Sequence, residues 1–136
     1  MQRHRSPIED GRHSVAVEDY LRTLIVLDDA GEPLSTANIA GHLQITCASV
    51  TQMAQRLAGL GLVEYQPYRA LRLTTEGRRA AEAIQARHRL MCTYLELQLD
   101  YAPADAIAEA DLMEHAMSQE LCNRIEHRLA NATVSD

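Results

Sequence analysis

The spacing of the apolar residues changes at residue 62, and this change constrains the fold more than any other feature. In residues 14–61 apolar residues recur every three or four positions, as they do on the buried face of an α-helix. In LVEYQPYRALRLT (62–74) they recur every second position on either side of QPYR, as in two strands joined by a turn. Helices followed by a two-stranded ribbon predict a winged helix-turn-helix.

Three helices are predicted before the ribbon, each bounded by residues that start or stop a helix. The first runs from Ser14 to about Ala30 and ends at AGEP. The second is LSTANIAGHLQI, with Ser35 as its N-cap. The third is TCASVTQMAQRLAGLG, with Thr46 as its N-cap and Gly61 as its C-terminal stop.

The chain beyond the ribbon is predicted to be entirely helical. A long helix covers TTEGRRAAEAIQARHRLMCTYLELQL, Pro103 opens a further helix through EADLMEH, and Ser118 caps a last one, QELCNRIEHRLA. Residues 1–13 have no periodicity and are predicted to be a disordered tail. The expected fold is mainly α, with a winged helix-turn-helix over residues 14–76 followed by a linking helix and a helical region over residues 77–136.

Composition favours a cytoplasmic protein that has no membrane segment. Hydrophobic residues make up 46% of the chain and charged residues 24%, as in ordinary globular proteins. No apolar run approaches the length of a membrane span, and the opening MQRHRSPIEDGRH lacks the apolar segment of an export signal. The three cysteines are widely spaced, which predicts neither a disulfide framework nor a zinc ribbon.

The net charge of −6 is unevenly distributed along the chain. Residues 35–79 contain five arginines and two acidic residues, whereas residues 80–136 contain four arginines and ten acidic residues. A basic middle predicts a surface that faces phosphate, and the acidic remainder predicts a part that faces cations.

The third helix would be the recognition helix of a helix-turn-helix, lying in the major groove of double-stranded DNA. Its exposed side chains are expected to be Ser49, Thr51, Gln52, Gln55 and Arg56. Arg69 and Arg72 of the ribbon would lie near the DNA backbone, and Arg78 and Arg79 could also do so. The alternative interpretation is an ordinary solvated polar helix face.

The stretch EADLMEHAMS (109–118) carries the second candidate site. Asp111, Glu114 and His115 are spaced i, i+3 and i+4, so on a helix their side chains project from one face. Asp19 and His88 are the candidates to complete the ligand set of a metal ion. Carboxylates with imidazoles suit Mn(II) or Fe(II), whereas structural zinc sites more often use thiolates. The alternative is again a charged helix face.

From about Ser14 to Ala130 the sequence resembles the DtxR/MntR family of metal-dependent transcriptional repressors. The resemblance is carried by EDYLRTLIVL, ITCASVTQMAQRL, YRALRLTTEG, RHRL and EADLMEHAMSQEL. It implies a homodimer that binds a palindromic operator when metal is bound. It also implies that residues 77–136 form a metal-binding and dimerisation domain.

The family's ligands are carried over position by position. Asp19 and Asp111 fall where the manganese branch has carboxylate ligands, Glu114 and His115 match a shared Glu-His pair, and His88 matches a second or ancillary position. The resemblance thus implies one strong site from Asp19, Asp111, Glu114 and His115, with His88 as a weaker or second-site ligand.

Two departures from the family pattern bear on a second ion. Arg22 stands where two-metal manganese repressors have a glutamate, and an arginine repels a cation. Cys92 and Ile107 stand at further ancillary positions of the iron branch, where only the thiolate of Cys92 could bind. The resemblance also implies the short, manganese-type architecture without an SH3-like domain.

We therefore expect a Mn(II)-responsive repressor of manganese-uptake genes and no enzymatic activity. Fe(II) is the alternative metal, and other divalent transition metals are expected to bind in vitro. Two rivals differ in kind. A winged-helix regulator could sense an organic ligand or oxidation, with Cys47 at the start of the recognition helix. A metal-dependent enzyme is the other rival, although no phosphate loop or nucleophile motif accompanies the cluster.

Overall fold

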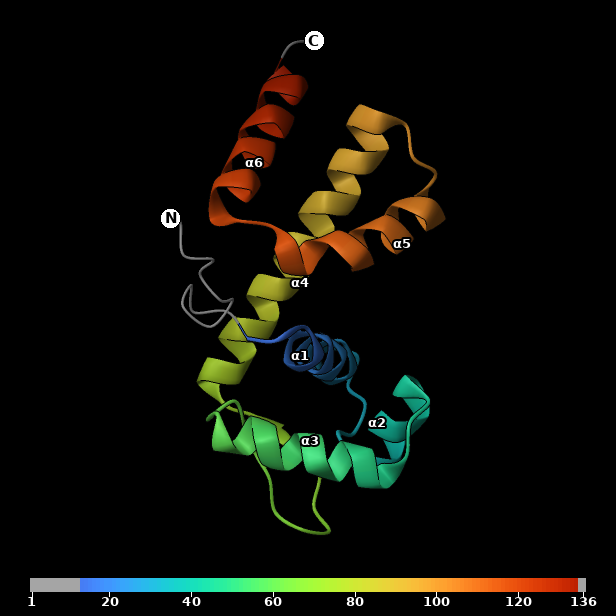
Figure 1. The fold of residues 1–136 in the computed structure, drawn as a ribbon, viewed down its shortest axis with the longest axis vertical. Coiled ribbons are helices and arrows are strands. Elements are labelled where there is room, and N and C mark those ends of the chain that lie inside the picture. The colour runs from blue at the N-terminus through green and yellow to red at the C-terminus, as the bar shows by residue number, and fades with distance from the viewer. Residues whose placement is uncertain (1–12, 135–136) are drawn as a thin grey trace, which may run out of the picture. The chain divides into compact units, whose positions relative to one another are not determined.

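The structure, a computed structural model, describes residues 13–134, so the tail predicted over residues 1–13 lies, except for His13, outside the described residues. The chain divides into two compact units, one ending at Glu82 and the other beginning at Ala83. In chain order the elements are α1 (Val15–Asp29), α2 (Thr36–Leu43), α3 (Cys47–Gly59), β1 (Val63–Glu64), β2 (Arg72–Leu73), α4 (Thr75–Leu99), α5 (Pro103–Met113), the 3-10 turn η1 (Glu114–Ala116) and α6 (Gln119–Val134) (Figure 1).

The helices of the first unit begin at serine or threonine caps, of which Ser35 and Thr46 were predicted. The side chains of Ser14, Ser35 and Thr46 each accept a hydrogen bond from the backbone N–H three residues later, at 3.4, 3.1 and 3.1 Å. Each cap satisfies a backbone donor that the first turn of a helix leaves unpaired. Gly61 has a φ of 77° and donates its N–H to the carbonyl of Ala58, which ends α3 as predicted.

The first unit packs around aliphatic side chains, because the chain has no Phe and no Trp. α1, α2, α3 and the ribbon region all contribute buried side chains to this core. The buried members of this core include Val17, Leu21, Leu24, Ile25, Ile39, Val50, Leu57, Leu62, Val63 and Leu71. Each such side chain stabilises the fold by about 1.5–3 kcal/mol relative to an exposed one.

The two-stranded ribbon is present but shorter than the alternating pattern suggests. β1 and β2 are antiparallel, with Val63 opposite Leu73 and Glu64 opposite Arg72. The backbone N–H of Leu71 donates to the carbonyl of Leu34, between α1 and α2, at 2.8 Å. Because that donor is used outside the ribbon, the strand pairing stops at Arg72, and Leu71 serves as a core residue next to the strand.

The first turn of α4 is fixed against the ribbon and against α1. Thr74 donates its backbone N–H to Leu62 at 3.1 Å and its hydroxyl to the carbonyl of Gly61 at 2.7 Å. Arg78 forms ion pairs with Asp28 and Asp29 at the end of α1, and the hydrogen bonds to these carboxylates raise the pKa of Arg78. Arg78 therefore has a structural role in joining α4 to α1.

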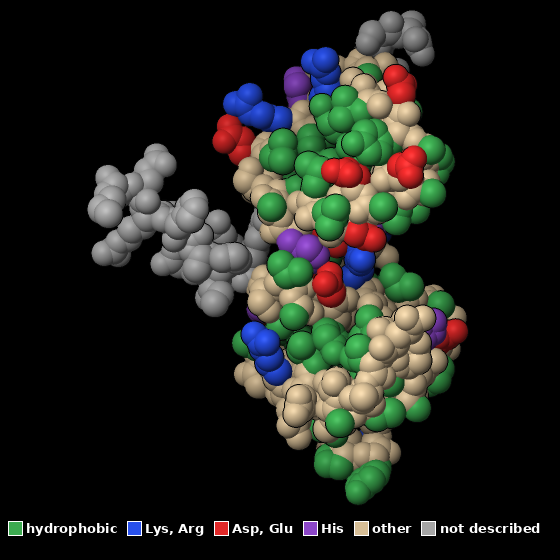
Figure 2. All heavy atoms as spheres, turned by 45° about the vertical axis from the view of Figure 1, so that its right-hand side comes forward, with side chains coloured by type: hydrophobic (Ala, Val, Ile, Leu, Met, Phe, Trp, Pro, Cys, Tyr) green, Lys and Arg blue, Asp and Glu red, His purple; other side chains and the backbone are tan. Residues whose placement is uncertain are grey.

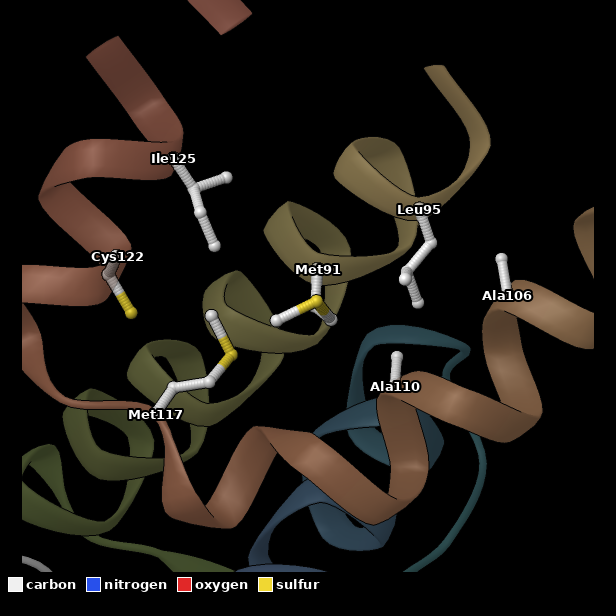
Figure 3. Packing of buried hydrophobic residues seen from close by; sticks show 7 residues of the cluster. All are labelled: Met91, Leu95, Ala106, Ala110, Met117, Cys122 and Ile125. Atoms are coloured by element: carbon white, nitrogen blue, oxygen red, sulfur yellow. The ribbon is translucent and has the colours of Figure 1, made fainter. Parts of the chain in front are cut away.

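The second unit has its own apolar core, to which α4, α5 and α6 all contribute (Figure 3). Its fully buried members are Met91, Leu95, Ala106, Ala110, Met117, Cys122 and Ile125. The small side chains of Ala106 and Ala110 let α5 lie close to α4. Ser118 caps α6 by accepting the N–H of Leu121 at 3.0 Å, as predicted. Among the described residues no helix is both long and apolar enough to cross a membrane.

Candidate metal centre and DNA-binding surface

The EADLMEH stretch is not one continuous α-helix, contrary to the sequence prediction. α5 ends at Met113, and Glu114–Ala116 form the 3-10 turn η1. The physical reason lies just downstream. Met117 is extended, with ψ 122°, because Ser118 must begin the cap of α6. Asp111 therefore stands on the last turn of α5, whereas Glu114 and His115 stand on η1.

Glu114 is the centre of the cluster, and its side chain is fully buried, with 0% of its surface exposed. Its Oε2 lies 2.5 Å from Nδ1 of His88, which α4 supplies. Its Oε1 lies 3.5 Å from Nε2 of His115. One carboxylate thus faces two imidazoles, one through each oxygen.

Asp111 joins the His88 side of this arrangement. Its Oδ1 lies 3.4 Å from Nδ1 of His88, and its side chain is 45% exposed. His88, Asp111 and Glu114 each offer a ligand atom, and these atoms lie within 4.8 Å of one another. The structure thus puts His88 in one group with Asp111 and Glu114, whereas His115 lies beside the other oxygen of Glu114.

The donor set fits a divalent transition metal ion. A buried carboxylate is costly unless it is paired with a positive charge or hydrogen bonds. Two carboxylates and a neutral imidazole are oxygen-rich, borderline-hard ligands of the kind that Mn(II) and Fe(II) accept. Asp19 and Arg22 belong to the first unit, where both stand on α1 with partly buried side chains.

Cys92 contacts His88 of this cluster. The sequence already carried a signal for this contact, because residues four apart on a helix lie on the same face. His88 and Cys92 are four residues apart on α4, and the sulfur lies 3.6 Å from Nε2 of His88. The thiol also lies 3.9 Å from the carbonyl oxygen of Ala106. Ile107, the other residue that departs from the iron-branch pattern, is 51% exposed. The two nitrogens of His88 therefore face different chemistries, carboxylates on one side and a thiol on the other.

The residues predicted to contact DNA lie on the surface of the first unit. Ser49, Gln52, Gln55 and Arg56 of α3 are exposed, and Thr51 is partly exposed. Arg69 and Arg72 of the ribbon region are also exposed. The Ser49 hydroxyl accepts from the Thr46 hydroxyl at 2.9 Å, so part of its hydrogen-bonding capacity is used in the helix cap. Cys47, at the start of α3, is an exposed thiol.

Two family models together cover almost the whole described chain. The N-terminal DNA-binding domain of iron dependent repressors matches residues 14–71, and their metal-binding and dimerisation domain matches residues 74–135. The chain belongs to the iron-dependent repressor family. The family consists of metal-dependent transcriptional repressors, as the resemblance in the sequence implied, and its two domains account for the mainly helical fold with an N-terminal winged helix-turn-helix.

The individual relatives include regulators named MntR and iron-dependent repressors. The chain is 30% identical to the transcriptional regulator MntR of Escherichia coli O157:H7, over 83% of this chain and 72% of the relative. It is 35% identical to the iron-dependent repressor IdeR of Mycobacterium leprae, over 87% of this chain and 51% of the relative. It is also 34% identical to an uncharacterised HTH-type regulator of Methanocaldococcus jannaschii, over 83% of this chain and 91% of the relative.

Solved structures of manganese regulators share the fold. A manganese-dependent transcriptional repressor in complex with manganese is 34% identical, with a TM-score of 0.72 over 84% of this chain and 52% of that one. The manganese regulator SloR is 27% identical, with a TM-score of 0.72 over 84% and 53%. The chain thus spans about half the length of these two structures and of IdeR.

Proposed function

We propose that this protein is a Mn(II)-responsive transcriptional repressor that binds a palindromic operator as a homodimer. The observation that carries the proposal is the group formed by His88, Asp111 and Glu114, whose ligand atoms lie within 4.8 Å of one another. Two of the three ligands are carboxylates, and such hard oxygen donors favour Mn(II). Asp111 also stands where the iron branch of the family has a cysteine.

His88, Asp111, Glu114 and His115 would hold the metal in the second unit, and the family resemblance adds Asp19 of α1. The two oxygens of Glu114 face different imidazoles, which supports a central role for this carboxylate. Arg22 stands three residues after Asp19 on the same helix and carries a positive charge. A second, fully occupied position beside Asp19 is therefore not part of the proposal.

The carboxylates of the cluster link metal binding to the stability of the segment that carries them. Two negative charges within 4.8 Å repel by about 1–3.5 kcal/mol for effective dielectric constants from about 80 down to 20. Asp111 is 45% exposed, so the lower part of that range applies. A bound divalent ion supplies the positive charge that offsets this repulsion. The end of α5 and η1, which carry both carboxylates, are then stabilised.

DNA recognition would reside in the first unit. Gln52 and Gln55 of α3 would read base edges in the major groove, with Ser49, Thr51 and Arg56 beside them, while Arg69 and Arg72 would contact phosphates. A symmetric dimer would read two half-sites separated by about one helical turn, or a multiple of it. The operator of manganese-uptake genes is the expected target.

The test begins with selection of binding sites from a random DNA duplex pool by the Mn(II)-loaded protein. Fluorescence anisotropy on the selected duplex then compares Mn(II), anaerobic Fe(II) and a chelator at one salt concentration, because phosphate contacts make affinity steeply salt-dependent. We expect tight binding only with metal, and the metal that acts at the lower concentration identifies the effector. Iron at the lower concentration would favour the Fe(II) alternative.

The key variant is Glu114→Gln, which keeps the shape of the side chain and removes its charge. Its control is Asp105→Asn, which changes an exposed acid in the first turn of the preceding helix, α5, outside the cluster. Loss of the free Mn(II) signal in electron paramagnetic resonance reports metal binding directly. We expect Glu114→Gln to lose both metal binding and DNA binding, and Asp105→Asn to retain both. Equal DNA binding with metal and chelator would instead favour a regulator that senses an organic ligand or oxidation.

A further inference from the structure

Tyr68, at the tip of the ribbon, has a backbone conformation that its side chain does not favour. The N–H of Arg69 donates to the carbonyl of Gln66 at 3.1 Å, which closes a four-residue turn. Pro67 occupies the second position of this turn and Tyr68 the third, with a φ of 65°. Glycine or asparagine normally fills this third position, because a β-carbon in the left-handed region is unfavourable.

Packing does not explain the tyrosine either. The side chain of Tyr68 is fully exposed, at 107% of its reference area, so its ring gains nothing from burial in the first unit. In Figure 1 the loop between the two strands projects beyond α3, and Figure 2 shows hydrophobic side chains on this projecting loop. A strained, unburied aromatic residue at a loop tip indicates a functional contact rather than a structural one.

The surroundings of Tyr68 are suited to a nucleic-acid backbone. The residue borders a groove of about 470 Å³ between the ribbon turn, the start of α2 and α3. The same groove is lined by the hydroxyls of Thr36, Thr51 and Tyr65 and by Arg69. Hydroxyls and an arginine are the side chains that most often contact phosphate and sugar. Thr51 belongs to α3, so the groove is continuous with the predicted recognition surface.

We infer that the ring of Tyr68 enters the minor groove of the operator beside each half-site, while Arg69 and the neighbouring hydroxyls hold the phosphates. This inference rests on the proposed function. α3 occupies the major groove in that function, so a ribbon beside it reaches the adjacent backbone and minor groove. Apolar and aromatic side chains inserted there unstack or widen base steps, and their effect depends on whether the step is A·T or G·C.

The first variant is Tyr68→Asn, because asparagine tolerates the left-handed conformation and removes the ring. We expect its thermal midpoint to equal or exceed that of the wild type, since the strain is relieved. We expect its affinity for the selected duplex to fall about tenfold or more, in line with the loss of an aromatic contact to bases. Tyr68→Phe, which retains the ring, should bind nearly as the wild type does.

The second arm changes the DNA that flanks the half-sites. Flanking A·T pairs are replaced by G·C, and then by inosine·cytosine, which has the major-groove edge of G·C but no minor-groove amino group. Wild-type affinity should fall with G·C and recover with inosine·cytosine. Tyr68→Asn should bind all three duplexes equally. Arg69→Ala is the control for phosphate contact, and it should weaken binding to all three alike and reduce the salt dependence.

The outcomes separate this inference from the proposed function. The inference would be overturned if Tyr68→Asn bound the selected duplex as tightly as the wild type does. It would also be overturned if the flanking base pairs still changed the affinity of Tyr68→Asn. Neither result would affect the proposal that DNA binding depends on metal. Flank effects that require Tyr68 but do not depend on metal would overturn the proposed metal switch alone. Absence of DNA binding under every condition would overturn both.

Discussion

Replacing Gly77 by alanine should destabilise the first unit, although alanine is the better helix former. A β-carbon built on Gly77 would lie 1.8 Å from the carbonyl oxygen of Leu62 and 2.8 Å from its carbonyl carbon. Ordinary contact begins at 3.4 Å, so the two backbones must separate by about 1.6 Å. Both atoms belong to backbone, so no change of rotamer can relieve the clash.

The expected cost follows from what holds α4 to the ribbon at this point. The two hydrogen bonds from Thr74, to Leu62 and to Gly61, would be stretched or broken, at about 1 kcal/mol each. Overpacking adds about 1–3 kcal/mol. The higher helix propensity of alanine offsets about 1 kcal/mol of this. The net destabilisation is therefore about 2–4 kcal/mol.

Urea denaturation followed by circular dichroism measures this difference. With a slope of about 2 kcal/mol/M, the transition midpoint of Gly77→Ala should fall by roughly 1–2 M. The matched control is Gly41→Ala in α2, where an added β-carbon meets nothing within 4 Å. That variant should be more stable than the wild type by about 0.5–1 kcal/mol. If Gly77→Ala is as stable as the wild type, the close approach of α4 to Leu62 is wrong.

Four further outcomes are expected. Arg78→Ala should lower the free energy of unfolding more than Arg79→Ala does, because Arg78 pairs with two aspartates of α1 whereas Arg79 pairs with Glu76 one turn away on its own helix. Solvent screens these exposed pairs, so added salt should reduce the difference in urea denaturation. Hydrogen bonds from Asn38 and then His42 lower the pKa of Glu32. The stability that Glu32 contributes is therefore present above its unfolded pKa and is lost as pH falls through the lower folded pKa. Glu32→Gln should flatten the acid side of the curve of unfolding free energy against pH. Met117→Ala, at a site 1% exposed, should cost about 2–5 kcal/mol in urea denaturation. Mn(II) at 100 times its dissociation constant should stabilise the protein by about 2.7 kcal/mol, and calorimetry of Glu114→Gln should show no such gain.

Features set by neighbouring residues could be predicted from the sequence. The starts of α1, α2, α3 and α6 follow from a serine or threonine whose side chain reaches a backbone donor three residues on. The stop at Gly61 likewise depends on one residue that adopts a positive φ without strain. The end of α5 at Met113 had a local signal too, because a cap at Ser118 requires the residue before it to leave the helix.

Features set by distant residues could not be predicted in this way. The ribbon is short because Leu71 donates to Leu34, a residue far away in the sequence. Arg78 is paired with Asp28 and Asp29, about fifty residues before it, and local charge gave no indication of this pairing. The candidate ligands were named from spacing and resemblance. That His88 contacts both carboxylates follows only from the packing of α4 beside the end of α5.

The two oxygens of Glu114 also bear on how such a cluster can evolve. Each oxygen faces a different imidazole, so any substitution of this residue alters two environments at once. Asp111 is half-exposed and lies against His88 at 3.4 Å, so a substitution there alters the edge of the cluster rather than its buried centre. Among descendants of this chain, selectivity for one ion over another should therefore diverge first at Asp111, and Glu114 should be the last residue of the cluster to change.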